Sequence, residues 1–265
     1  MDTRALFDQL RRSYSDITPQ ASQVWSLLES RGDTPTNDHV ALRTFADPRI
    51  GLEVMGKVFE DLGFEARDRY VFEAKKLRAR YYFRAGFPKV FISELDLGAM
   101  PEPVTTIINE LIAQTPSDWT LDPAWIARGR PWSPTLRDYR TLAETSEYAA
   151  WLAAHGFCAN HVTVDVGSLS SVADLAELTE VLAEAGFELN QAGGIIKGGP
   201  DVCLAQASTR ADQIDVRFQD GTMKVPSCYV EFAQRYRQAG GEVYQGFIAS
   251  SADKIFESTD RKPGE

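Results

Sequence analysis

An internal repeat is the feature that most constrains the fold of this chain. Residues 38–45 are typical of a strand, and an amphipathic helix is predicted to follow over residues 50–62, before the tripeptide Gly-Phe-Glu. The same order returns at residues 160–166 and 169–185, again before Gly-Phe-Glu. The glycine of the tripeptide follows the strand histidine by 24 residues in the first copy and by 25 in the second. A repeat of this length predicts a fold built from two similar modules.

Each copy continues with stretches that are typical of further strands. In the first copy, apolar and polar residues alternate over residues 76–83, and an apolar run follows at residues 90–95. The second copy offers three such stretches, at residues 202–207, 213–218 and 227–232. Each module is predicted to have the order β-α-β-β-β, of which the first copy shows two of the three final strands, with a histidine on its first strand and a glutamate on its last. Duplicated modules of this order predict an α+β fold.

The rest of the chain is predicted to be helical, within a single two-module domain over residues 1–265. Two helices are expected in residues 1–35, and Thr18-Pro19 is predicted to provide the N-cap and the first position of the second helix. The first module is expected at residues 36–100, a helical connector at residues 101–157, and the second module with the C-terminal tail at residues 158–260.

The charge balance and the cysteines exclude several kinds of protein. The chain has 28 Lys and Arg against 38 Asp and Glu, a net charge of −10, which argues against nucleic-acid binding through a basic surface. It has no apolar run of about 18 residues, so no membrane partner is expected. Cys158, Cys203 and Cys228 fit no zinc or CxxC spacing, which favours reduced thiols and a cytoplasmic location.

Two of the three histidines, His39 and His161, occupy the same place in the repeated strand. A lone strand histidine is more often a core residue, but its repetition favours metal binding, because neutral imidazole is a good ligand for transition metals. Glu94 and Glu231 are the two candidate carboxylates. Three protein ligands would suit dioxygen chemistry on a non-haem Fe(II) ion, whereas four would suit a zinc or nickel lyase or isomerase. The repeat alone leaves both sets open.

Arg43 is the second residue that points to chemistry. It follows His39 by four residues on the same strand, so the two side chains are expected on one face, with their Cα atoms roughly 13 Å apart. A guanidinium group offers a fork that matches a carboxylate, which predicts that Arg43 binds an acidic substrate. The alternative is a surface salt bridge to Asp47.

Four other segments carry weaker signals. His155 is expected at the surface or behind a metal ligand, because it has no partner in the repeat. Residues 193–199 are rich in glycine without a phosphate-loop spacing, which favours a flexible hairpin or an active-site flap. Gln206 is predicted either to contact a bound oxygen or to be a buried structural amide. Ser250 and Ser251 lack a convincing base, which argues against a serine hydrolase.

Taken together, these motifs resemble the vicinal oxygen chelate superfamily and, more narrowly, the 2-oxoadipate dioxygenase/decarboxylase family. The resemblance lies in residues 38–45, 160–163, 229–232 and the tail over 246–259. It implies two modules that form a curved mixed sheet around a metal site. It also implies an Fe(II) enzyme that converts 2-oxoadipate and O2 to D-2-hydroxyglutarate and CO2 in lysine catabolism.

The resemblance also implies roles for particular residues. His39, His161 and Glu231 match the metal ligands of the family, which favours Glu231 over Glu94. Arg43 matches the catalytic-site arginine that holds the distal carboxylate of the substrate.

Two further positions are matched more loosely. Gln206 matches a glutamine of the substrate pocket, and Ser250 lies near a serine that contacts substrate. Two other functions stay open, a metal-dependent lyase or isomerase of the glyoxalase type that also uses Glu94, and a non-catalytic small-molecule-binding protein. No oligomeric state is predicted.

Overall fold

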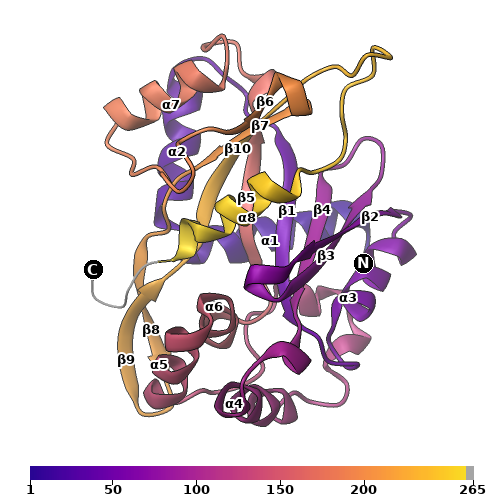
Figure 1. Cartoon of the computed structure of the whole chain (residues 1–265), viewed down its shortest axis with the longest axis vertical. Helices are drawn as coiled ribbons and strands as arrows, with labels where there is room; N and C mark the ends of the chain where they lie inside the picture. Colours follow the sequence, from indigo (N-terminus) through magenta and orange to yellow (C-terminus); the bar gives the residue numbers. More distant parts are fainter. Residues whose placement is uncertain (261–265) are drawn as a thin grey trace.

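Two copies of one four-strand arrangement lie side by side in an eight-stranded, curved, mixed sheet (Figure 1). The structure is a computed structural model that describes residues 1–260. The first module consists of β1 (Asn37–Phe45), α3 (Leu52–Asp61), β2 (Glu65–Phe72), β3 (Leu77–Phe83) and β4 (Lys89–Leu95). The second consists of β5 (Ala159–Asp165), α7 (Leu175–Glu184), β6 (Lys197–Gly199), β7 (Leu204–Ser208) and β10 (Tyr229–Arg235).

The strand order β2-β3-β4-β1-β5-β10-β7-β6 shows the duplication directly. In each module the first strand pairs in parallel with the last, β1 with β4 and β5 with β10, and the two first strands pair antiparallel at the centre of the sheet. The central strands β1 and β5 are buried along almost their whole length, polar residues included, because they are covered on both faces. The predicted α+β fold with duplicated modules is therefore confirmed.

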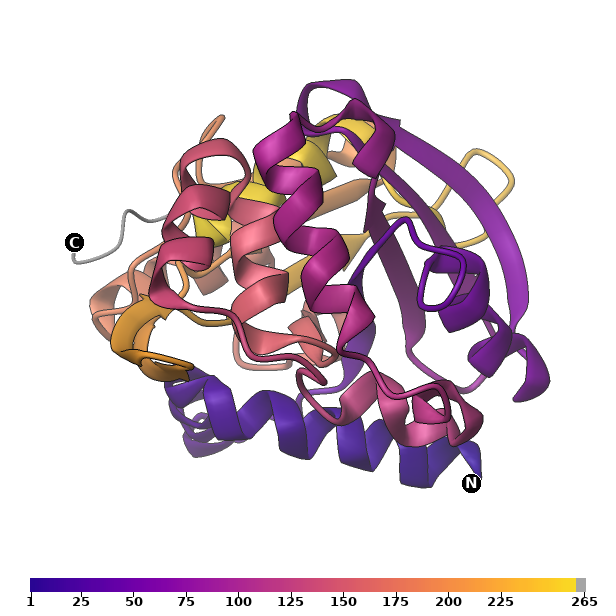
Figure 2. The same ribbon diagram turned by 90° about the horizontal axis from the view of Figure 1, so that it is seen from below.

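Helices cover both faces of the sheet. The N-terminal helices α1 (Thr3–Ile17) and α2 (Pro19–Ser30) pack on β5 and β10, and Figure 2 shows them opposite the C-terminal helix α8 (Ala249–Ile255). The connector contains α4 (Glu102–Ala113), α5 (Leu136–Thr145) and α6 (Glu147–His155). Short 3-10 helices complete the described chain: η1 (Glu73–Lys75), η2 (Leu97–Ala99), η3 (Trp119–Leu121), η4 (Pro123–Ala127), η5 (Val166–Ser168), η6 (Pro200–Val202) and η7 (Phe256–Thr259). Within residues 1–260, no helix is both long and apolar enough to cross a membrane.

In the second module, the strands that join the main sheet are not all those that the sequence predicts. Residues 213–218 form β8 (Gln213–Phe218), but β8 pairs with β9 (Gly221–Pro226) in a separate two-stranded sheet. The edge strand is instead β6, which lies in the glycine-rich segment that was expected to be a hairpin or flap, and which pairs with β7. Three residues are too few for an alternating pattern to reveal a strand.

The two predicted helix starts have different outcomes. α2 begins at Pro19 with Thr18 at the N-cap position, as predicted, but the Thr18 side chain makes no capping hydrogen bond, and its hydroxyl group donates to the carbonyl oxygen of Tyr14 at 2.6 Å. The helix expected from residue 169 begins at Leu175, where Asp174 accepts a hydrogen bond from the backbone N–H of Glu177.

Candidate metal centre

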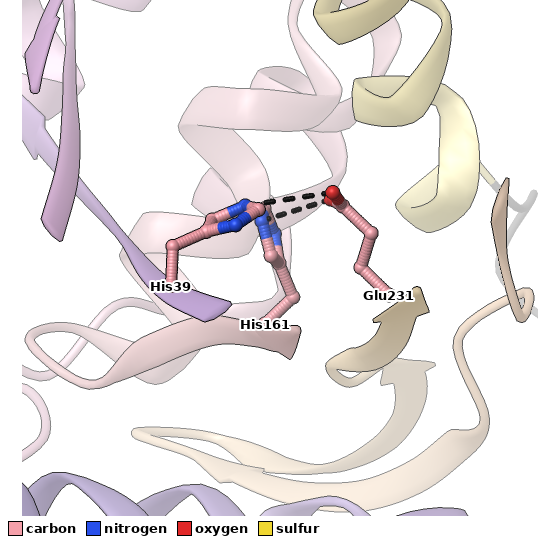
Figure 3. A group of neighbouring side chains, drawn as sticks. All are labelled: His39, His161 and Glu231. Atoms are coloured by element: carbon pink, nitrogen blue, oxygen red, sulfur yellow. Dashed lines mark ion pairs between the residues drawn. The ribbon is translucent and has the colours of Figure 1, made fainter. Parts of the chain in front are cut away.

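His39, His161 and Glu231 converge from three adjacent central strands (Figure 3). Their ligand atoms lie within 4.8 Å of one another, and all three side chains are buried. His39 Nε2 lies 3.4 Å from one carboxylate oxygen of Glu231, and His161 Nε2 lies 3.1 Å from the other. Two imidazoles and one carboxylate of this kind can hold a divalent metal ion and leave coordination positions open.

The strand register explains this convergence. Thr163 of β5 is paired with His39 of β1 on one side and with Glu231 of β10 on the other. His161 lies two residues before Thr163, so its side chain points to the same face of the sheet. Residues that are far apart in the chain therefore meet above one central strand.

A buried carboxylate holds His39 from behind. Asp38 Oδ2 lies 2.7 Å from His39 Nδ1, and the same carboxylate accepts hydrogen bonds from Arg235 at 2.6 and 2.9 Å and from Lys89 at 3.3 Å. Burial opposes ionisation of Asp38, but the charge of Arg235 and the hydrogen bonds outweigh it, so its pKa lies well below the usual range. An ionised Asp38 accepts the Nδ1 proton of His39, which leaves the Nε2 lone pair directed at the centre.

The other two ligands are also prepared for a metal ion. Burial and the nearby His39 lower the pKa of His161 well below its usual value, so this ring is neutral at pH 7. Its Nδ1 atom lies 3.3 Å from Asn160 Oδ1. Gln206 donates a hydrogen bond from Nε2 to Glu231 Oε1 at 2.7 Å. Burial disfavours the charged form of Glu231 and raises its pKa above the usual value. A cation at the centre would offset the unfavourable burial of this carboxylate.

Glu94 lies away from this centre. In the parallel pair β1–β4, Glu94 is opposite Thr44, five residues beyond His39, whereas Glu231 is opposite a residue only two beyond His161. The position that corresponds to Glu231 in the first module is Phe91. Glu94 instead accepts a hydrogen bond from the backbone N–H of Leu52 at the start of α3, at 2.9 Å, and lies 3.1 Å from Arg78.

Arg43 is buried, and the salt bridge to Asp47 that was the alternative prediction is not formed. Asp47 pairs with Arg49, at 2.9 Å. Arg43 instead donates from Nη1 to Glu147 Oε1 at 2.9 Å and from Nη2 to Thr259 Oγ1 at 3.0 Å. Its Nε atom has no hydrogen-bond partner among the residues that the structure describes.

A small cavity of about 20 Å³ lies at the metal centre. Besides the three ligands, its walls include the polar residues Gln206 and Tyr229 and the apolar residues Phe91, Phe247, Ala252, Ile255 and Phe256. The ring of Phe256, which lines the cavity, also lies 5.9 Å from the Arg43 guanidinium group.

Two sequence-based expectations need correction. Ser250 is exposed on α8 and does not line the cavity, whereas Ala252 and Ile255, which lie two and five residues later, do. His155 is not at the surface, because it ends α6 inside the core and its Nε2 atom lies 2.8 Å from the carbonyl oxygen of Pro226. Burial lowers the pKa of His155 to about 4.

The sequence analysis overlooked Tyr229 and Phe247. Tyr229 lies two residues before Glu231 on β10, so strand alternation alone places it on the face of the ligand. No local signal identifies Phe247, because it reaches the cavity from a loop, where its ring packs 4.8 Å from that of His39.

The chain is similar to known proteins in sequence and in fold. A model of the 2-oxoadipate dioxygenase/decarboxylase family matches residues 2–127 and 125–240. The chain is 34% identical to the chloroplastic 2-oxoadipate dioxygenase/decarboxylase of Arabidopsis thaliana, over 97% of this chain and 77% of that protein.

Two solved structures are similar over most of their length. The hydroxyglutarate synthase from Oryza sativa was solved in complex with 2-oxoadipate. Its structure has a TM-score of 0.90 and 31% sequence identity, and the match covers 97% of this chain and 91% of that chain. The structure of a protein from Shewanella frigidimarina, described as a hydrolase, has a TM-score of 0.89 and 41% sequence identity. The match covers 94% of this chain and 98% of that chain.

Proposed function

Because this chain belongs to the 2-oxoadipate dioxygenase/decarboxylase family, we propose that it is an Fe(II)-dependent enzyme that converts 2-oxoadipate and O2 to D-2-hydroxyglutarate and CO2. The convergence of His39, His161 and Glu231 is the observation that carries this proposal. This reaction would serve the breakdown of lysine.

The donor set fits an Fe(II) ion. Two neutral imidazoles and one carboxylate form the ligand set that non-haem Fe(II) oxygenases use, and this set leaves positions for substrate and O2. Asp38 fixes which nitrogen of His39 faces the centre, and Gln206 holds one oxygen of Glu231. When bound, the iron would supply the oxidising chemistry with O2.

The protein would orient the substrate and exclude water. Arg43 would hold the distal carboxylate while the 2-oxo acid end lies over His39, His161 and Glu231. The apolar walls, among them Phe91 and Phe247, would keep bulk water from the reacting carbon.

Substrate binding would require two local movements. A cavity of about 20 Å³ holds little more than one water molecule, so side chains over residues 247–256 would have to move aside. The carboxylate of Glu147 already occupies Nη1 of Arg43, and a second carboxylate there would repel it. The Glu147 side chain is 26% exposed, so it can turn toward solvent when substrate arrives.

An oxygen electrode tests the proposal on protein that has been loaded with Fe(II) under anaerobic conditions. We expect O2 uptake and CO2 release with 2-oxoadipate, and less with its monoacid analogue 2-oxohexanoate. Substrate turnover without O2 uptake would instead favour a lyase or isomerase. Failure to retain stoichiometric metal would favour a non-catalytic binding protein.

We place the enzyme in the cytoplasm as part of the same proposal. Cys158, Cys203 and Cys228 are all free thiols, which fits a reducing compartment. The Arabidopsis relative is named as chloroplastic, and that location is a property of that protein. Fractionation of the source cells with an antibody against this chain would test the assignment.

A further inference from the structure

Tyr229 lines the metal cavity, and its hydroxyl group finds no partner among the described residues. Its side chain is completely buried, and its hydroxyl group has no hydrogen-bond partner among residues 1–260. A buried hydroxyl group that lacks a partner is unfavourable, and buried tyrosines normally find one. A phenylalanine would fill the same space without this cost, so the hydroxyl group requires an explanation.

The ring of Tyr229 is held in one position from two sides. It stacks on the imidazole of His161, with centroids 4.7 Å apart and planes 29° apart. The backbone carbonyl oxygen of Tyr229 accepts a hydrogen bond from the hydroxyl group of Tyr14 at 2.7 Å. The pairing of β10 with β5 sets Tyr229 directly opposite His161. The orientation of the Tyr229 ring is therefore fixed before any ligand binds.

The surroundings of the hydroxyl group indicate what it would bind. Tyr229 lines the cavity together with His39, His161 and Glu231, the three residues that would hold the metal. A phenol hydroxyl group can donate a hydrogen bond to an oxygen atom of a ligand that enters this cavity.

We propose that the Tyr229 hydroxyl group donates a hydrogen bond to an oxygen atom of the 2-oxo-carboxylate end of the bound substrate. The contact is to the 2-oxo-carboxylate end because the ring stacks on His161, one of the residues that would hold the metal. This inference rests on the proposed function and assigns a substrate contact to a residue that the sequence pattern did not single out.

Tyr82 provides a matched control. It is also completely buried, and its hydroxyl group likewise has no partner in the described part of the chain. Tyr82 lies on β3, where this hydroxyl group abuts Gly56 of α3, and it does not line the metal cavity. Tyr82→Phe therefore removes the same chemical group at a place where no substrate binds.

The test measures binding of 2-oxoadipate and 2-oxohexanoate to anaerobic Fe(II)-loaded protein by calorimetry, together with metal content and thermal unfolding of the metal-free protein. For Tyr229→Phe we expect unchanged metal content, unchanged or increased thermal stability, and about 10-fold weaker binding of both acids. Tyr82→Phe should bind both acids as the wild-type protein does. The KM of Tyr229→Phe for 2-oxoadipate should rise by a similar factor.

Three results would overturn the assignment. Wild-type affinity of Tyr229→Phe for both acids would show that no such hydrogen bond forms. Weaker binding of 2-oxoadipate alone would place the contact at the distal carboxylate instead. If the wild-type protein bound neither acid, the proposed function would be refuted together with this assignment, and that result is distinguishable from the first two.

Discussion

Asp38 Oδ2 lies 2.7 Å from Nδ1 of His39, a contact that has only a weaker counterpart in the second module. There the residue before the histidine is Asn160, and its Oδ1 atom lies 3.3 Å from His161 Nδ1. A carboxylate makes the ring that it contacts a stronger and better-oriented ligand than an amide does. The two histidines of the repeat are therefore equivalent in position but differ in the group that holds the ring from behind.

Asp38→Asn should weaken metal binding by about 10- to 100-fold, because the fixed tautomer and the negative charge behind His39 are lost. Competition with a chromophoric chelator measures this change. Asp47→Asn is the control, since it breaks a partly exposed ion pair with Arg49 at 2.9 Å and leaves the centre intact. Equal metal affinity in Asp38→Asn and the wild-type protein would contradict the role of Asp38.

Glu94→Gln should leave metal content unchanged, whereas Glu231→Gln should lose the ion. Glu94 contacts the start of α3 and Arg78 rather than the two histidines. Metal analysis after anaerobic loading and gel filtration distinguishes the two variants. Loss of metal from Glu94→Gln would instead support a four-ligand site of the kind that a lyase or isomerase would use.

Arg43→Met should keep the metal and raise the KM for 2-oxoadipate by about 100-fold, because a charge-assisted, two-point contact with the distal carboxylate is removed. The KM for 2-oxohexanoate, which lacks that carboxylate, should change little. Steady-state O2 uptake with both acids measures the difference. An equal loss with both acids would mean that Arg43 supports the fold of the site rather than substrate recognition.

Glu147→Gln should act in the opposite direction. The wild-type carboxylate lies 2.9 Å from Nη1 of Arg43 and would compete with the substrate for this group. A neutral amide competes less, so 2-oxoadipate should bind severalfold more tightly to the variant. Calorimetry under anaerobic conditions measures the affinity, and weaker binding would show that Glu147 orients Arg43 instead of blocking it.

His155 should make the protein sensitive to acid. Its pKa in the folded state is about 4, below the value of roughly 6.5 in the unfolded chain. The neutral His155 ring therefore makes its full contribution to the free energy of unfolding above pH 6.5, and this contribution is lost as the pH falls through 4. Between pH 7 and 5 the loss should be about 2 kcal/mol.

Urea unfolding of the metal-free protein at several pH values measures this loss. His155→Gln is the comparison, because glutamine stays neutral and can still donate to the carbonyl oxygen of Pro226. The free energy of unfolding of this variant should depend less on pH over the same range. Identical pH dependence in the two proteins would contradict the assignment.

Local pattern determined most of the elements of this fold. The strand-like patterns of residues 38–45 and 160–166 and the amphipathic period of residues 50–62 appear in β1, β5 and α3, because each pattern depends only on neighbours within a few residues. The repeat also identified His39 and His161, since equal positions in two copies of one strand face the same side of a shared sheet.

Tertiary structure decided which residues meet. The repeat could not choose between Glu94 and Glu231, because the register of a parallel strand pair depends on contacts between segments far apart in the chain. The partner of Arg43, Glu147, lies 104 residues away, and Tyr229 faces His161 only through the pairing of β10 with β5. Periodicity carries no information on such distances, so the ligand set and the walls of the cavity emerge only when the strands assemble.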